Sequence, residues 1–325
     1  MSDRTVVRWL LGDDQPGICY RTLTELEGRS PQEGELRELR RAIPRRGWVA
    51  EILSTRRRGG WWCSRESLYR PKYLATNWQM LVLSDLGVDR TVPAVRVSAE
   101  LWMRVFAARG GGLGGNSLGR AHHCLAGNMA RALIRLGYAD DRRVARTMEW
   151  LAESADPKGG WSCFGKGRNL DSWEGLSAFA VYPRSRWTPR MRRCVELGAE
   201  FFLERQLSQQ GARYAPWFRT HYPIHYYYDL LVGLETLTSL GYSDDRRLRP
   251  AAEWLLRRRR SDGRWNLDAI HPDVEGAVAR WFAAHPGQRP SPLAFEKAGR
   301  ASKMITLRAL LVQSRFDGVV TPATG

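Results

Sequence analysis

Two carboxylates near the middle of the chain have a spacing suited to acid–base chemistry. Asp171 and Glu174 are three positions apart, which places both side chains on one face of a helix. Two carboxyl groups in one apolar site can differ in proton affinity, so that one is a protonated acid and the other an ionised stabiliser. The alternative is structural, with Asp171 capping the helix and Glu174 completing a capping box. A residue can fill both roles, so both are candidate catalytic residues.

An aromatic run later in the chain could line a site for a cation or an apolar chain. Its candidate substrate contacts are Trp217, Tyr222 and Tyr226. In the same run His225 and Asp229 are four positions apart, and on a helix this carboxylate would orient and charge the imidazole for general acid–base work. His225 and Asp229 are therefore candidate catalytic residues. The alternative for the rings is ordinary core packing with hydrogen-bonded hydroxyl groups.

Further candidate substrate contacts lie before or within the first turn of apolar stretches with helical spacing. They are Trp78, His122, His123, Lys166, Arg168 and Trp173. For His122 and His123 the alternative is a structural role, which is the commoner role of a histidine beside an apolar helix.

Cysteine usage bears on metal binding and on the cellular compartment. The five cysteines lie far apart and include no Cys-x-x-Cys pair. This usage predicts a reduced protein, and the N-terminal residues lack the apolar core of a secretory signal, so we expect a cytoplasmic location. Cys163, Asp171 and His225 have ligand types that suit zinc, but their spacing alone does not define a site. We therefore predict no definite cofactor and keep zinc as an alternative.

Glycine-containing turns recur along the chain and set the elements that must position these residues. The turns are centred on Gly60, Gly111, Gly160, Gly211 and Gly263, at steps of about fifty residues. Each turn leads to an apolar stretch with helical spacing, and a more charged helical stretch follows. No convincing strand alternation is present. The pattern predicts an all-α repeat protein.

The two classes of stretch predict two layers of helices. The expected inner helices are 73–86, 122–136, 171–181 and 225–240. The expected outer helices are 92–107, 141–153, 189–206 and 244–260, and further helices are expected at 18–27, 33–55 and 302–314. Such hairpins stack as an open solenoid or close into a ring, and rigid Gly-Gly-Trp turns with a buried indole favour the ring. We expect one (α/α) toroid of five to six hairpins over residues 1–325, with an irregular loop at about 280–295.

The turns Gly59-Gly60-Trp61 and Gly159-Gly160-Trp161, each before an apolar helix, resemble the repeats of squalene-type terpenoid cyclases and protein prenyltransferase β subunits. These are the prenyltransferase and squalene oxidase repeats, and the resemblance extends over residues 55–315. It implies an (α/α) toroid whose inner helices surround a central cavity with their N-terminal ends. It also implies an isoprenoid substrate.

The resemblance extends to individual residues, with departures. In prenyltransferase β subunits, basic residues that contact diphosphate precede zinc ligands, and here Lys166 and Arg168 match the basic pair approximately. Asp171 matches the aspartate ligand and His225 lies near the expected histidine, but Trp173 stands where the cysteine ligand should be. The Asp-x-Asp-Asp run of class II cyclases is absent, and 171–174 is its nearest equivalent by position. The resemblance therefore implies a non-standard acid for any cyclisation.

Composition narrows the function classes. The chain has 43% hydrophobic and 26% charged residues, which allows a large core and excludes a disordered or collagen-like chain. No stretch approaches the roughly 18 to 20 apolar residues of a membrane span. The 51 Lys and Arg against 34 Asp and Glu give a formal net charge of +17, which attracts nucleic acid, anionic lipid or phosphorylated substrates.

Two hypotheses follow. The first is an isoprenoid-processing enzyme that binds a polyprenyl or polyene substrate, with or without a diphosphate, in a central aromatic cavity. Acid-initiated cyclisation is its preferred chemistry, zinc-dependent prenyl transfer is a variant, and peripheral membrane contact is compatible with it. The second, ranked lower, is a non-catalytic toroidal scaffold that binds a polyanion such as nucleic acid.

Overall fold

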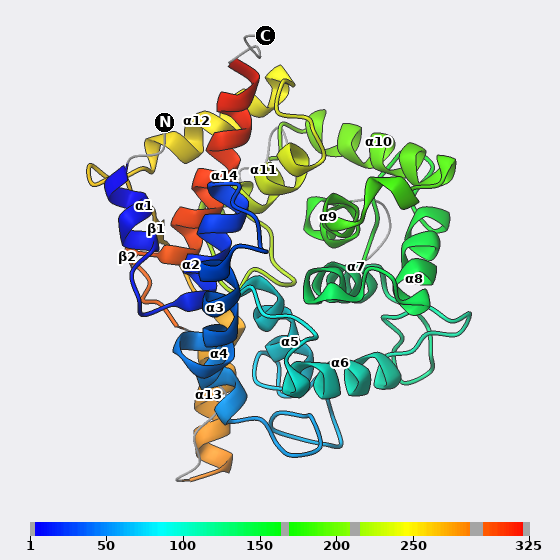
Figure 1. Ribbon diagram of the computed structural model, residues 1–325. Helices are drawn as coiled ribbons and strands as arrows, with labels where there is room; N and C mark the ends of the chain where they lie inside the picture. Colours follow the sequence, from blue (N-terminus) through cyan, green and yellow to red (C-terminus); the bar gives the residue numbers. More distant parts are fainter. Residues whose placement is uncertain (1–3, 164–168, 209–214, 287–294, 321–325) are drawn as a thin grey trace.

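The structure, a computed structural model, describes residues 4–163, 169–208, 215–286 and 295–320 (Figure 1). Within these ranges the chain is all-α, as predicted. The strands found there are one antiparallel pair of two residues each, β1 (Asn266–Leu267) and β2 (Arg300–Ala301). No helix in the described part is long and apolar enough to cross a membrane.

The inner helices form a closed cycle, in which each helix packs against its neighbours. Its members are α2 (Pro16–Arg21), α5 (Thr76–Asp85), α7 (His123–Leu133), α9 (Glu174–Val181), α11 (Leu230–Ser239) and α14 (Lys303–Val320). From α5 to α14 each contacts the next in chain order, α14 returns to α2, and α4 (Gly47–Ser54) joins α2 to α5 (Figure 1). All of α5, and all of α7 after its first residue, is buried, because a helix with neighbours on every side needs no polar face.

A second group of helices lies outside the first. Its members are α3 (Gly34–Ala42), α6 (Pro93–Val105), α8 (Arg142–Glu153), α10 (Pro189–Leu203) and α12 (Arg249–Arg257). Each packs on the inner helix before it in the chain, as α8 packs on α7 and α12 on α11. α8 buries Val144, Met148 and Leu151, which recur at helical spacing, while its other face carries charged residues.

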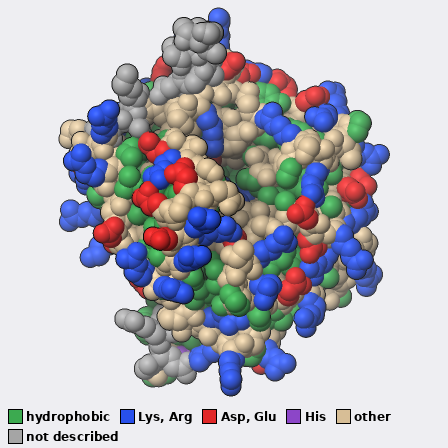
Figure 2. Space-filling model, in the orientation of Figure 1, with side chains coloured by type: hydrophobic (Ala, Val, Ile, Leu, Met, Phe, Trp, Pro, Cys, Tyr) green, Lys and Arg blue, Asp and Glu red, His purple; other side chains and the backbone are tan. Residues whose placement is uncertain are grey.

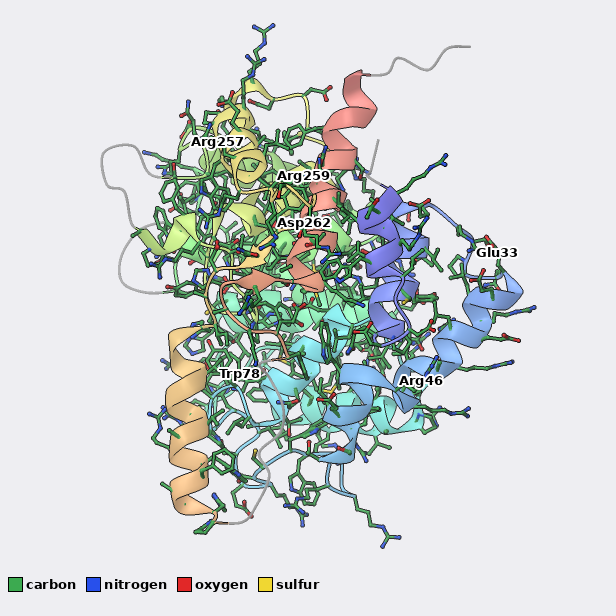
Figure 3. All side chains as sticks on the ribbon, turned by 90° about the vertical axis from the view of Figure 1, so that its left-hand side faces the viewer. Glu33, Arg46, Trp78, Arg257, Arg259 and Asp262 are labelled. Atoms are coloured by element: carbon green, nitrogen blue, oxygen red, sulfur yellow. The ribbon has the colours of Figure 1, made fainter. Side chains whose placement is uncertain are left out.

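Shorter elements connect these helices. The remaining α-helices are α1 (Arg4–Leu10) and α13 (Pro272–Ala284), and the π-helical turns are η1 (Thr22–Leu26) and η3 (Ile134–Tyr138). The 3-10 helices are η2 (Ile43–Arg45), η4 (Leu170–Ser172), η5 (Arg184–Arg186), η6 (Ala215–Phe218) and η7 (Arg246–Leu248). In a side view α13 lies along one side of the molecule (Figure 3).

One tryptophan contact recurs in three of the turns. The indole Nε1 of Trp62 donates to the carbonyl oxygen of Ile52 at 2.8 Å, and Trp265 makes the same bond to Leu255 at 2.8 Å. Trp161 bonds the carbonyl oxygen of Leu151 at 3.1 Å. Each buried indole thus ties a turn back to the helix that precedes it. In the first turn the buried ring belongs to Trp62, and the neighbouring Trp61 is half-buried.

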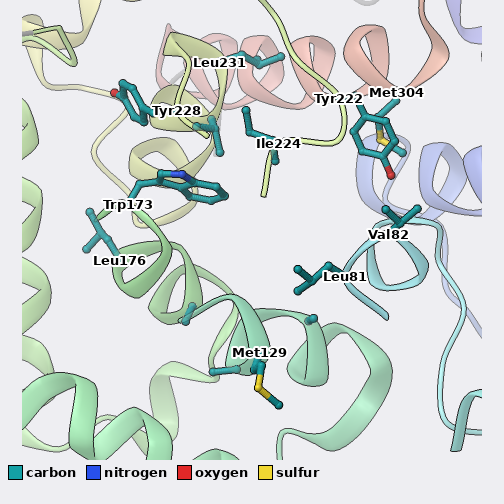
Figure 4. Packing of buried hydrophobic residues seen from close by; sticks show 14 of the residues in the cluster. Leu81, Val82, Met129, Trp173, Leu176, Tyr222, Ile224, Tyr228, Leu231 and Met304 are labelled. Atoms are coloured by element: carbon teal, nitrogen blue, oxygen red, sulfur yellow. The ribbon is translucent and has the colours of Figure 1, made fainter. Parts of the chain in front are cut away.

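The centre of the inner group is filled by side chains from several elements. Leu81 of α5 and Met304 of α14 are fully buried, and Ile224 reaches the same region from the segment before α11 (Figure 4). α11 begins at Leu230, later than the predicted start at 225, so the segment that precedes it is free to enter the centre. Part of the predicted loop at 280–295 is helical, since α13 runs to Ala284, and residues 287–294 lie outside the described residues.

Candidate functional site

The start of α9 carries Glu174 into the interior of the protein. The side chain of Glu174 is 1% exposed. α9 lies so close to α7 that a Cβ atom added to Gly127 would be 2.5 Å from the backbone carbon of Glu174. Gly127 therefore allows the close approach of α7 and α9 that buries Glu174.

The other residues predicted beside Glu174 are only partly described. Asp171 lies in η4, and its side chain is outside the described residues, as are Lys166 and Arg168 altogether. The capping-box alternative requires Asp171 to be the N-cap of α9. The N-cap position is Trp173 instead. Trp173 is buried, its Nε1 donates to the carbonyl oxygen of Tyr227 at 2.6 Å, and Arg131 lies 5.7 Å from its ring centroid.

Several rings pack together near the N-terminal ends of α5 and α9. We call Tyr69, Tyr73, Trp78, Tyr226 and His271 the aromatic cluster. The ring centroids of Tyr73 and Trp78 are 4.4 Å apart, those of Trp78 and Tyr226 are 5.2 Å apart, and those of Tyr73 and His271 are 4.6 Å apart. Trp78 and Tyr226 are among the predicted substrate contacts, whereas Tyr69 and His271 are not.

The charge of Glu174 acts on two phenols of the aromatic cluster. Burial raises the pKa of Tyr69 to about 12, and the negative charge of Glu174 acts in the same direction. Burial also raises the pKa of Tyr226 well above its ordinary value, again with a contribution from Glu174. The two phenols are thus neutral at physiological pH, and the arrangement combines a buried carboxylate with aromatic faces.

The remaining predicted rings lie elsewhere. Trp217 packs edge-on against Tyr228, with ring centroids 5.6 Å apart, in the hydrophobic core. Tyr222 is 3% exposed and lies near Met304 (Figure 4). These two rings therefore do not join the aromatic cluster.

The two histidines at the start of α7 face other groups. His122 is exposed, and its Nε2 lies 3.2 Å from the side-chain nitrogen of Asn116. His123 stacks on Trp150 of α8 with ring centroids 4.9 Å apart, and burial lowers its pKa. Both contacts are of the structural kind that was the alternative at these positions.

The predicted pair of His225 and Asp229 is wrong. Tyr226 has φ of 61°, outside the right-handed helical region, so the two side chains do not share a helical face. Asp229 caps α11, accepting from the backbone nitrogens of Val232 at 2.8 Å and His221 at 2.9 Å. His225 Nε2 instead lies 3.3 Å from Asp85 Oδ2, and burial outweighs this carboxylate and lowers the pKa of His225.

The weak zinc candidates do not converge. Cys163 lies against Cys124, whose backbone nitrogen donates to its Sγ at 3.0 Å, while His225 faces Asp85. The contact with Cys124 lowers the pKa of Cys163, and the contact with Cys163 raises that of Cys124. Across the described ranges, no group of three or more His, Cys, Asp or Glu side chains could hold a metal ion.

A second site lies toward the C-terminal ends of the inner helices and was not predicted. We call it the arginine pocket, and its charged members are Arg21, Glu25, Asp85, Arg131, Arg135, Glu235, Arg308 and Arg315. It includes a cavity of about 470 Å³, and the face of the molecule is hollowed near its centre (Figure 2).

A sequence signal for the arginine pocket exists in hindsight. Arg131, Glu235 and Arg308 each lie in a largely apolar helical stretch, with no other charged residue within three positions on either side. A helix that is apolar on all sides is buried in the protein, so a charged residue within it is buried too. A buried charge needs a partner of opposite charge or hydrogen-bond partners. The partners come from helices far apart in the sequence, so the local pattern could not identify them.

Comparison with solved structures finds weak likenesses to a type II terpene cyclase, MstE from Scytonema. Its apo structure is 17% identical, covering 82% of this chain and 95% of that chain, with a TM-score of 0.33. A variant in complex with its substrate, geranylgeranyl dihydroxybenzoate, is 18% identical over 84% and 95%, with a TM-score of 0.31. No family model matches the chain, and neither does any curated protein. Likenesses at this identity and TM-score decide nothing about the activity of this chain.

Proposed function

We propose that the chain is a single (α/α) toroid over residues 1–325, with five to six hairpins and a repeat of about fifty residues. The cycle of contacts among the inner helices supports this, as does the pairing of each outer helix with the inner helix before it. The recurrent tryptophan bonds of the turns support the repeat. The free state of all five cysteines is compatible with the cytoplasmic location that we propose.

We propose further that the protein is an isoprenoid-processing enzyme of the terpenoid cyclase type, with acid-initiated cyclisation as its chemistry. One observation carries this proposal: the side chain of Glu174 is buried, and its charge acts on the phenols of Tyr69 and Tyr226, which belong to the aromatic cluster. An acid that starts a cyclisation must be shielded from water and must face the alkene. The aromatic faces must then stabilise the cation that forms.

In the proposed reaction Glu174, with Asp171 as its partner, gives a proton to one carbon of an alkene, and the alkene's π electrons form the new C–H bond. The other alkene carbon becomes cationic and is attacked by the next double bond. Loss of a proton from the final cation restores the acid. The ring of Trp78 contacts those of Tyr73 and Tyr226 in this structure, so a polyene must part these rings to bind. Lys166 and Arg168 are proposed contacts for a diphosphate group, where the substrate carries one.

The test replaces Glu174 with glutamine, which keeps the shape of the side chain and removes the acid. The wild-type protein should convert an uncharged polyene or a polyprenyl diphosphate to cyclic products detectable by gas chromatography and mass spectrometry. Glu174→Gln should lower the rate about a hundredfold or more, the typical contribution of a general acid.

The matched control is Glu149→Gln, at an exposed position of α8 that is paired with Arg146 at 3.1 Å. This variant should keep the wild-type rate. A Glu174→Gln variant that folds and turns over at the wild-type rate refutes the assignment of Glu174. A wild-type protein that cyclises no polyene refutes the proposed activity.

A further inference from the structure

The arginine pocket gathers more positive than negative charge in the interior. Its five arginines come from α2, α7, η3 and α14, and its three carboxylates from η1, α5 and α11. Two positive charges are therefore in excess when all the side chains are ionised. Burying charge without full compensation is costly, so this excess requires an explanation.

The carboxylates of the pocket are already paired with arginines. Asp85 Oδ1 accepts from Arg135 at 2.7 Å and from Arg131 at 3.3 Å. Glu235 accepts from Arg308 Nε at 2.8 Å. Although burial acts in the opposite direction, the neighbouring arginines hold the pKa of Asp85 well below its ordinary value and lower that of Glu235 to about 2.

Glu25 is paired in the same way, with Arg21 at 2.6 Å, and neighbouring charges lower its pKa although burial would raise it. The three carboxylates are thus ionised and engaged at neutral pH. They do not provide the missing negative charge.

Several donors of the pocket remain without an acceptor. Arg308 is 4% exposed, and its Nη1 and Nη2 have no hydrogen-bond partner within the described part of the chain. The hydroxyl of Tyr222, 3% exposed, also has none there. Burial and the neighbouring Arg135 lower the pKa of Arg131 to about 10, and burial lowers that of Arg315. The charges of Arg131 and Arg315 are therefore incompletely compensated by the protein itself, whereas Glu235, Asp229 and Asp85 raise the pKa of Arg308 although burial would lower it.

The pocket has room for a ligand. The cavity of about 470 Å³ is lined by Arg131, Arg135 and Arg315, with Ala180 and Val181 of α9 on its apolar wall. Arg308 and Tyr222 do not line this cavity. They line an adjoining crevice that is too narrow for a water molecule and that shares Arg131 and Arg135 with the cavity, so the ligand reaches these two donors only if the crevice widens. The larger volume is in the range of small-molecule sites.

We propose that the arginine pocket binds a phosphate group, either free or as part of a phosphorylated small molecule. Two excess positive charges match the charge of a phosphate ester near neutral pH, and the planar fork of guanidinium donors matches its oxygens. The pocket lies mainly toward the C-terminal ends of the inner helices, although its cavity reaches Trp173, the residue before Glu174. The proposal requires no acid chemistry at Glu174, so it does not depend on the proposed cyclase activity.

The test measures binding to the full-length protein by isothermal titration calorimetry, with inorganic phosphate, pyrophosphate and a short prenyl diphosphate as probes. Arg315→Gln is the main variant, because Arg315 donates to the carbonyl oxygen of Glu235 and the hydroxyl of Thr238, so its removal does not take an ion-pair partner from a carboxylate in the described structure. Arg135→Gln is the second variant. Each should weaken binding about tenfold or more, as expected for the loss of a charge-assisted hydrogen bond.

The control is Arg257→Gln on α12, at a side chain that is 69% exposed and lies on the outer layer (Figure 3). It should bind like the wild type, and binding should persist at about 0.5 M salt, because buried charges are screened less than exposed ones. Circular dichroism and thermal unfolding without ligand show whether each variant is folded.

Three results would overturn the proposal: no binding to the wild type at millimolar probe, equal affinity in a folded Arg315→Gln variant, or binding that salt abolishes and that Arg257→Gln weakens as much. The choice of probe identifies the source of the phosphate. Tightest binding of the inorganic probes indicates a small phosphorylated metabolite. At least tenfold tighter binding of the prenyl diphosphate indicates a phosphorylated isoprenoid. A failure of Glu174→Gln to affect cyclisation leaves these outcomes unchanged.

Discussion

At the scale of single residues, the interior of the protein contains carboxylates that are paired with arginines. Asp85, Glu235, Arg131 and Arg308 are almost completely buried, while Arg135, which pairs with both carboxylates, is 20% exposed. The desolvation that buried charges suffer is offset only where the pairing is close. Glu235 is the clearest case, since it accepts from Arg308 at 2.8 Å and lies 3.6 Å from Arg135. Its removal leaves two guanidinium groups with less negative charge around them.

We expect Glu235→Gln to lower the free energy of unfolding by about 3 to 5 kcal/mol at pH 7, as for a broken buried pair. The pKa of Glu235 is lowered to about 2 in the folded state, below its ordinary value of about 4.5. A depressed pKa contributes stability that is present above the unfolded pKa and is lost as the pH falls toward the folded one. The difference between wild type and variant should therefore shrink as the pH falls from about 4.5 to about 2.

Urea unfolding followed by circular dichroism across this pH range measures the difference directly. Glu149→Gln, at an exposed ion pair, serves as the reference and should change stability by less than about 1 kcal/mol at every pH. A difference between wild type and Glu235→Gln that stays constant from pH 7 to pH 3 would contradict the assigned pKa.

At the scale of elements, the turns and the helix crossings rely on particular residues. The indoles of Trp62, Trp161 and Trp265 are each 0 to 1% exposed and bond to a carbonyl oxygen of the preceding helix. Trp61 adjoins Trp62 in the sequence, but it is half-buried, with Arg65 lying 5.6 Å from its ring centroid. The chain thus offers two adjacent tryptophans of which one carries the recurrent contact.

Trp62→Phe should destabilise the protein by roughly 2 kcal/mol or more, because it loses both buried volume and the indole hydrogen bond. Trp61→Phe should cost less than about 0.5 kcal/mol, since its ring is partly in solvent. Chemical denaturation of both variants tests the pair. If both variants lose the same free energy of unfolding, the indole hydrogen bond of Trp62 is not what stabilises the turn.

The crossing of α7 and α9 depends on Gly127. A Cβ atom there would lie 2.5 Å from the backbone carbon of Glu174 and 2.7 Å from its carbonyl oxygen, so Gly127→Ala must push the helices apart. We expect a loss of about 1 to 3 kcal/mol from overpacking. Gly34→Ala at the start of α3, where an added Cβ meets no atom within 4 Å, should be neutral or slightly stabilising. Thermal unfolding of the two variants checks this, and a neutral Gly127→Ala would contradict the close approach of α7 and α9.

At the scale of the whole molecule, what the sequence predicts well is local and what it misses depends on distant contacts. The apolar period of 76–85 and 123–133 lies within each segment, so the inner helices were predictable to within a few residues. The pairing of Asp85 with Arg131, Arg135 and His225 joins three separate segments, and only the closed cycle of helices brings them together. The false His225–Asp229 pair came from extending a helix through residues whose backbone instead enters the centre of the molecule.

A closed ring and an open stack of hairpins differ in the local stability of their terminal helices. α14 packs on α11, α2 and η1, so the last helix is held by the first as well as by its predecessor. In an open stack the terminal hairpins have one neighbour and fray first, whereas in a ring every hairpin has two. Native-state hydrogen exchange should therefore give amides of α14, from Thr306 to Leu311, an opening free energy close to that of the buried amides of α7. If α14 exchanges at far lower free energy while α7 stays protected, the ends are not closed on each other, and the toroid proposed for this chain is wrong.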